Sequence, residues 1–207
     1  ERIQGKGPWW QKDYSEANKS AVTAYSDLDK AMDGAMFSGN KAIEQIQKFY
    51  DIGTVEDKLK NYKVFGVSDK EWAKTGGDVE KQLQLIDKTW GDRKNNERAK
   101  IFVQAIRNVQ NGTASAFDQN IVSLARNLEV AESGTEVGAT KFSEIVNINN
   151  EEQAVEAAAA ALKTAKEHSK SGYKSSSKGY STGASNTTAT ISTSTRSTVS
   201  SPMGDNN

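Results

Sequence analysis

Hydrophobic residues recur at three- and four-residue steps along most of the chain, which is the pattern of amphipathic helices. The first apolar stripe follows Tyr14 and consists of Ala21, Tyr25, Leu28, Met32 and Ala35. Gly34 and the run 38–40 break or kink this pattern, and it then resumes with Ile43, Ile46 and Phe49. The spacing therefore predicts two successive helices in the first fifty residues.

The same pattern predicts further helices after residue 77. Asp78 can cap a helix with the face Val79, Leu83, Ile86 and Trp90, and a separate helix is expected over about 94–110, ending at a turn-forming Asn-Gly pair. The next stripe is Phe117, Ile121, Leu124, Ala125 and Leu128, followed by a shorter piece around 142–146. Asn149 or Asn150 can cap an Ala-rich helix over about 151–168.

Between residues 51 and 77 the pattern weakens into short pieces. Thr54 can cap one turn, and Ser68 with Glu71 has the spacing of a capping box. The run 64–67, Val-Phe-Gly-Val, has no partner strand elsewhere in the sequence, so it is predicted to be a buried loop.

These elements predict an all-α fold, an elongated antiparallel helical bundle of about five to seven helices over residues 14–168. Residues 1–13 carry two Gly, a Pro and several basic residues, and they are expected to form an irregular arm. More than half of the residues from 169 to 201 are Ser or Thr, with very few aliphatic side chains. Such a segment cannot offset the entropy of ordering it, so residues 169–207 are predicted to be a disordered tail.

Composition narrows the range of functions. The 27 basic and 27 acidic residues balance, so the net charge does not indicate a nucleic acid or an anionic membrane as partner. No apolar run approaches the roughly 20 residues of a membrane span. The chain contains no Cys and a single His, His168, whose place at a predicted helix end suits the helix dipole. We therefore expect no metal site, no cofactor and no catalytic triad.

Several residues are candidates for contacts with other molecules. Two adjacent indoles in an irregular arm, Trp9 and Trp10, favour packing against the body or another protein. The small side chains along the last predicted helix would let a partner approach closely, and these are Ala154, Ala158, Ala161 and Ala165. Tyr173 and Tyr180 alternate with lysines, a pattern compatible with stacking on single strands. Trp72 and Trp90 are instead expected in the core.

The chain is therefore predicted to be a non-enzymatic structural or interaction protein, self-associating or bound to protein partners in a larger assembly. Its low proline content, lack of Cys, Asn/Gln-rich helices and Ser/Thr-rich end resemble the composition of phage virion proteins and exported adaptor subunits of secretion machines. This resemblance favours a virion or extracytoplasmic location. The alternative is a module that binds an extended polymer, nucleic acid or glycan. A hydrolase using only carboxylates, such as Glu71, ranks third.

Overall fold

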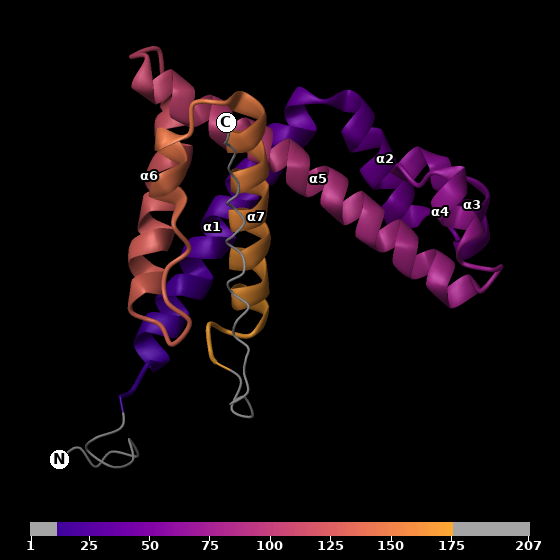
Figure 1. The fold of residues 1–207 in the computed structure, drawn as a ribbon, viewed down its shortest axis with the longest axis horizontal. Coiled ribbons are helices and arrows are strands. Elements are labelled where there is room, and N and C mark those ends of the chain that lie inside the picture. The colour runs from indigo at the N-terminus through magenta and orange to yellow at the C-terminus, as the bar shows by residue number, and fades with distance from the viewer. Residues whose placement is uncertain (1–11, 176–207) are drawn as a thin grey trace, which may run out of the picture. The chain divides into compact units, whose positions relative to one another are not determined.

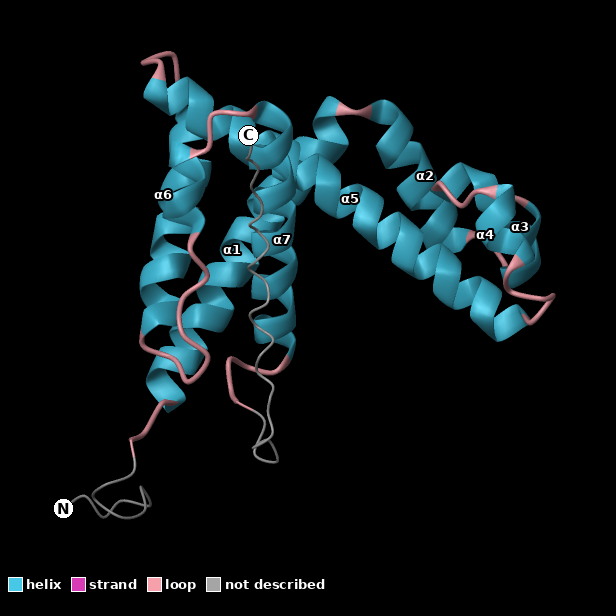
Figure 2. Cartoon of the chain, viewed as in Figure 1, coloured by secondary structure: helices cyan, strands magenta, loops and turns pink. Residues whose placement is uncertain are grey.

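The computed structural model describes residues 12–175, and residues 1–11 and 176–207 lie outside the described part. Within residues 12–175 the chain forms only helices and connecting loops, without a strand (Figures 1 and 2). The all-α class predicted from the sequence is confirmed. The elements are α1 Ser15–Gly39, α2 Lys41–Ile52, α3 Val55–Lys60, the 3-10 helix η1 Tyr62–Phe65, α4 Asp69–Ala73, α5 Val79–Gln110, α6 Ala116–Ser133, the 3-10 helix η2 Phe142–Asn147 and α7 Glu151–Lys170.

Polar side chains begin most of these helices by accepting hydrogen bonds from backbone N–H groups that have no partner within the helix. The accepting residues are Asn40, Thr54, Ser68, Asp78, Ser115 and Asn150. Thr54, Asp78 and Asn150 confirm caps that the sequence predicts, whereas of the capping box predicted from Ser68 and Glu71 only the bond from the Glu71 N–H to the Ser68 side chain forms. Ser115 and Asp118 form a reciprocal capping box at the start of α6 that the sequence analysis did not identify.

Helix α5 differs from its prediction. Two helices were expected on either side of residues 91–93, but α5 is continuous over 32 residues. The prediction of a break was wrong because it followed the apolar stripe, which disappears over a charged and polar stretch. Backbone hydrogen bonds continue through such a stretch, and exposed pairs such as Lys88 and Asp92, 3.0 Å apart one turn along the helix, support it. Gly91 is accommodated within the helix.

The buried side chains form two clusters. The first, here called the bundle core, joins α1, the second half of α5, α6, η2 and α7, of which α1, α6 and α7 lie next to one another in Figure 1. Its largest members include Leu28, Met32, Phe102, Ile121, Leu128, Phe142 and Tyr173. The second, the aromatic core, joins the end of α1, α2, η1 and the first half of α5 around Met36, Ile43, Phe65, Val67, Ile86 and Trp90. Helix α5 therefore belongs to both clusters.

The segment that was predicted to be a buried loop closes the aromatic core. Phe65 and Val67 are buried, as expected, but the prediction was wrong for Val64, which is exposed, and Val64 and Phe65 lie in the 3-10 helix η1 rather than in a loop. Gly66 between them has φ of 102°, a conformation that strongly favours glycine. This turn lets two consecutive apolar side chains of one short segment reach the same core.

Candidate functional site

Some of the residues predicted from the sequence to make contacts lie in the part of the chain that the structure describes, and others lie outside it. Trp9, Trp10 and Tyr180 lie outside the described residues, so their predicted roles stay predictions. Ala154, Ala158, Ala161, Ala165 and Tyr173 lie within the described part, and their surroundings can be examined.

The alanine face of α7 is occupied by the chain itself. Ala154, Ala158 and Ala165 are fully buried, and Ala161 is partly buried against the same cluster. Helix α7 packs along α5, where the Asn95 side chain donates a hydrogen bond to the backbone oxygen of Ala159 at 2.8 Å. The small side chains do allow close approach of a helix, but that helix is α5, so this face is not available to another protein.

The close packing of α7 on α5 predicts that a larger side chain at Ala158 destabilises the fold. Replacing Ala158 by leucine is expected to lower the free energy of unfolding by about 1–3 kcal/mol, because a packed core resists added methylene groups. Denaturant unfolding followed by circular dichroism measures this change. Ala160→Leu, on the exposed face of the same helix, is the control and should be nearly neutral. Equal losses in both variants would contradict the packing.

Tyr173 lies in the bundle core rather than in a tail. Its side chain is fully buried, and its backbone N–H donates to the His168 oxygen at 2.7 Å, just beyond the end of α7. The backbone has φ of 62°, a left-handed conformation that is unfavourable for a bulky residue and must be held by its surroundings. The expectation that the tail begins at residue 169 is corrected accordingly, since the helical body continues through Tyr173. A buried ring also cannot stack on a polymer.

A polar cluster surrounds this tyrosine. Glu132, at the end of α6, is fully buried, and its Oε1 atom accepts a hydrogen bond from the backbone N–H of Thr140 at 2.8 Å. Its Oε2 atom lies 3.8 Å from Nδ1 of His168 on α7. Burial, followed by the nearby Glu132 carboxylate, raises the pKa of the Tyr173 hydroxyl. We call Glu132, Thr140, His168 and Tyr173 the Glu132 cluster, a feature without sequence signal because carboxylates are usually exposed.

A second charged contact joins α1 to the middle of α5. The Arg98 side chain is largely buried and donates to Asp33 at 2.6 Å, with Asp29 at 3.6 Å. Burial raises the pKa of Asp29, and the neighbouring Asp33 raises it further, while Arg98 opposes both effects. The contact crosses 65 residues of sequence. Its groups are paired with one another, and this arrangement serves the fold rather than chemistry.

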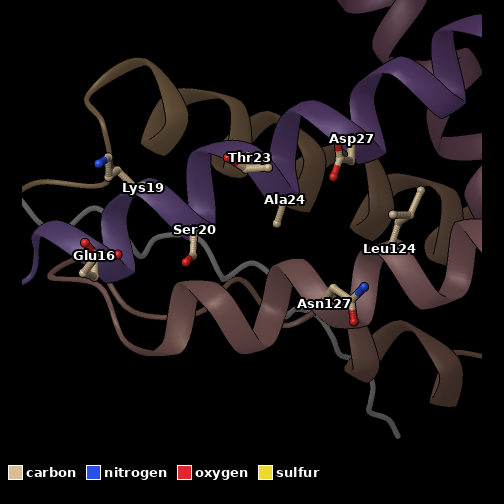
Figure 3. A pocket seen from close by; sticks show the side chains of 8 residues that line it. All are labelled: Glu16, Lys19, Ser20, Thr23, Ala24, Asp27, Leu124 and Asn127. Atoms are coloured by element: carbon tan, nitrogen blue, oxygen red, sulfur yellow. The ribbon is translucent and has the colours of Figure 1, made fainter.

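A shallow groove lies between α1 and α6. Figure 3 shows Ser20 and Ala24 of α1 pointing towards α6, which contributes Leu124 and Asn127. Polar and charged side chains form most of the remaining wall, and these are Glu16, Lys19, Thr23 and Asp27. The residues offer no paired acid and base, and the groove is open to solvent, so it does not resemble a catalytic or cofactor pocket.

Exposed apolar side chains are most frequent in the stretch of chain that contributes to the aromatic core. Among the described residues, four of the nine large exposed hydrophobic side chains belong to residues 52–79, and we call Ile52, Val55, Val64 and Val79 the apolar rim. Ile52 is 83% exposed and Val55 is 50% exposed, on either side of the junction between α2 and α3. The rings of Tyr62 and Trp72 stack at 4.0 Å in the same region.

Other classes of site find no support within residues 12–175. There, no three acidic or histidine side chains come together as metal ligands would. None of the helices in this part of the chain combines the length and hydrophobicity of a membrane span. Comparison with protein-family models, curated proteins and solved structures gave no match to this chain.

Proposed function

We propose that this chain is a non-enzymatic interaction protein, a subunit or adaptor of a larger assembly such as a virion or a secretion apparatus, and that the apolar rim is its main contact surface. The observation that carries the proposal is the exposure of Ile52 and Val55 at one helix junction, beside Val64 and Val79 in the same stretch of chain. Exposed aliphatic side chains that gather in one region are typical of protein contact sites.

The energetics of burial support this assignment. Covering a single Ile or Val side chain contributes about 1.5–3 kcal/mol, so two of them provide a useful anchor. A stable interface also needs roughly 800 Å² from each partner, more than these side chains supply alone. The neighbouring helices α2, α3 and α4 offer polar surface around the rim, which matches the usual arrangement of an apolar centre with a polar edge.

The assembly is proposed to include further copies of this chain. Sedimentation equilibrium of the full chain, from low to high micromolar concentration, is expected to show mass above that of one chain for wild type. The double variant Ile52→Lys, Val55→Lys is expected to sediment as a monomer, because two charges would have to be buried at the contact. A wild type that stays monomeric throughout would reject self-assembly through the rim.

The control variant is Val130→Lys. Val130 is 68% exposed, but it lies on α6, which belongs to the bundle core rather than to the rim. Its replacement should leave the association unchanged. Circular dichroism of both variants must match wild type, so that a loss of association is not confused with a loss of fold. Equal dissociation in both variants would mean that the rim is not the contact.

A further inference from the structure

The Glu132 cluster contains buried polar atoms without hydrogen-bond partners. These are Oε2 of Glu132, Oγ1 of Thr140 and Nδ1 of His168. A buried carboxylate with an unpaired oxygen is costly, since the protein interior solvates charge poorly. Such an arrangement becomes favourable when a positive charge or a proton is added beside the carboxylate.

His168 is placed to supply that charge. Its Nδ1 atom lies 3.8 Å from Oε2 of Glu132, and its side chain is 26% exposed, so the ring can exchange protons with solvent. A protonated ring has an N–H on both nitrogens and brings a positive charge to the carboxylate, whereas a neutral ring has one N–H and brings no charge. Histidine is the side chain that changes charge nearest neutral pH, and this is the only histidine in the chain.

The other ionisable groups around the pair come from three elements. Tyr173 follows α7 and meets the His168 ring edge to face at 5.9 Å. Tyr25 of α1 interacts electrostatically with both Tyr173 and Glu167, which precedes His168 on α7. The loop that follows Glu132 supplies Thr140 and also carries Glu136 and Lys141. Both tyrosines have raised pKa values, Tyr25 mainly through burial, so they stay neutral near pH 7.

Tyr173 contacts the pair at several points, in addition to its packing in the bundle core and the hydrogen bond from its hydroxyl to the Ala165 oxygen at 3.4 Å. Its backbone N–H bonds to the oxygen of His168, its ring packs on the His168 ring, and its hydroxyl lies near the Glu132 carboxylate. Its φ of 62° is unfavourable, so the segment relaxes when these contacts weaken. Lys174, the next residue, begins the C-terminal unit of the chain.

We infer that the His168 and Glu132 pair is a pH-sensitive latch, which holds the end of α7 and Tyr173 in the bundle core when His168 is protonated and loosens them when it is neutral. Only the closed form places the Glu132 carboxylate beside the His168 ring, so a positive charge on the ring favours closing and its loss favours opening.

Amide hydrogen exchange of the full chain, measured by NMR and corrected for the intrinsic pH dependence, tests the latch. Protection of the Tyr173 amide is expected to fall about tenfold between about pH 5 and pH 8 in wild type, with no such change at Leu128 in the bundle core. His168→Gln and Glu132→Gln should abolish the difference. His168→Lys, which keeps a positive charge there, should retain high protection at both pH values.

Three results would overturn the proposal: constant protection of Tyr173 in wild type, the same pH dependence in His168→Gln, or a pH dependence in His168→Lys equal to that of wild type. If a variant does not fold, the pH dependence of Tyr173 protection in wild type still tests the proposal. The ring signals of Tyr173 are expected to shift with the same midpoint as those of the single histidine. Independent midpoints would also reject the latch.

Discussion

Replacing Trp90 by alanine is expected to lower the free energy of unfolding by about 3–5 kcal/mol, since removal of a large aromatic side chain leaves a cavity that the core cannot fill. Trp90 is only 1% exposed, meets Phe65 edge to face at 6.0 Å, and donates from its indole N–H to Gln47 at 2.9 Å. The substitution therefore removes packing and leaves the Gln47 oxygen with one donor fewer. Urea unfolding followed by circular dichroism measures the change.

Trp72→Ala provides the matched control for Trp90→Ala. Trp72 stacks on Tyr62 but is partly exposed, so its replacement should cost markedly less than that of Trp90. The two variants remove the same side chain from the same part of the fold. A Trp72→Ala variant as unstable as Trp90→Ala would contradict the conclusion that Trp90 contributes more than Trp72 to the packing of the aromatic core.

The bundle core is expected to be equally sensitive at Leu128. This side chain is fully buried on α6, and its truncation to alanine is expected to cost about 2–5 kcal/mol, the sum of lost apolar burial and the remaining cavity. Thermal unfolding should show a lower Tm than wild type. The loss within this range depends on how far α1 and α6 can move together to fill the cavity left at Leu128.

Val130→Ala tests whether the loss at Leu128 arises from burial. Val130 lies two residues away on the same helix and is largely exposed, so alanine should be neutral or slightly favourable there, given its higher helix propensity. A comparable loss of stability in both variants would indicate that the helix itself, and not the buried contact, limits stability at this position.

Much of the fold could be predicted because helices that pack into one body must bury one face. The stripe around Leu28 and Met32 predicts α1, and the caps at Asp78 and Asn150 predict where α5 and α7 begin. These signals are local, since each depends on residues three or four apart. The expected number of helices was close for the same reason.

The predictions were wrong where tertiary contacts determine whether a side chain is buried. The alanine face of α7 has the same pattern whether it meets α5 or another chain, and only the fold shows that α5 covers it. Tyr173 follows a helix end within a polar, Ser-rich sequence, and a single buried ring leaves no periodic signal. In both cases the sequence gives the side chain's character but not its neighbour.

The candidate sites were hidden from sequence analysis for related reasons. Ile52 follows Phe49 at the three-residue spacing of the α2 stripe, yet it is the last residue of the helix and is exposed. Glu132 has the ordinary appearance of a charged residue near a helix end, yet it is enclosed by the loop through Thr140 and by the end of α7. Neither exposure of an apolar side chain nor burial of an acid follows from composition.

The contact of Arg98 with Asp33 has a consequence for how this chain can change over evolution. The backbone leaves the bundle after Asp33 and returns to the same place at Arg98, having formed the aromatic core and the apolar rim in between. A segment whose two ends are held together by such a contact can gain, lose or exchange residues without moving those ends. The bundle core can thus stay constant while the segment between Asp33 and Arg98 changes in sequence or length.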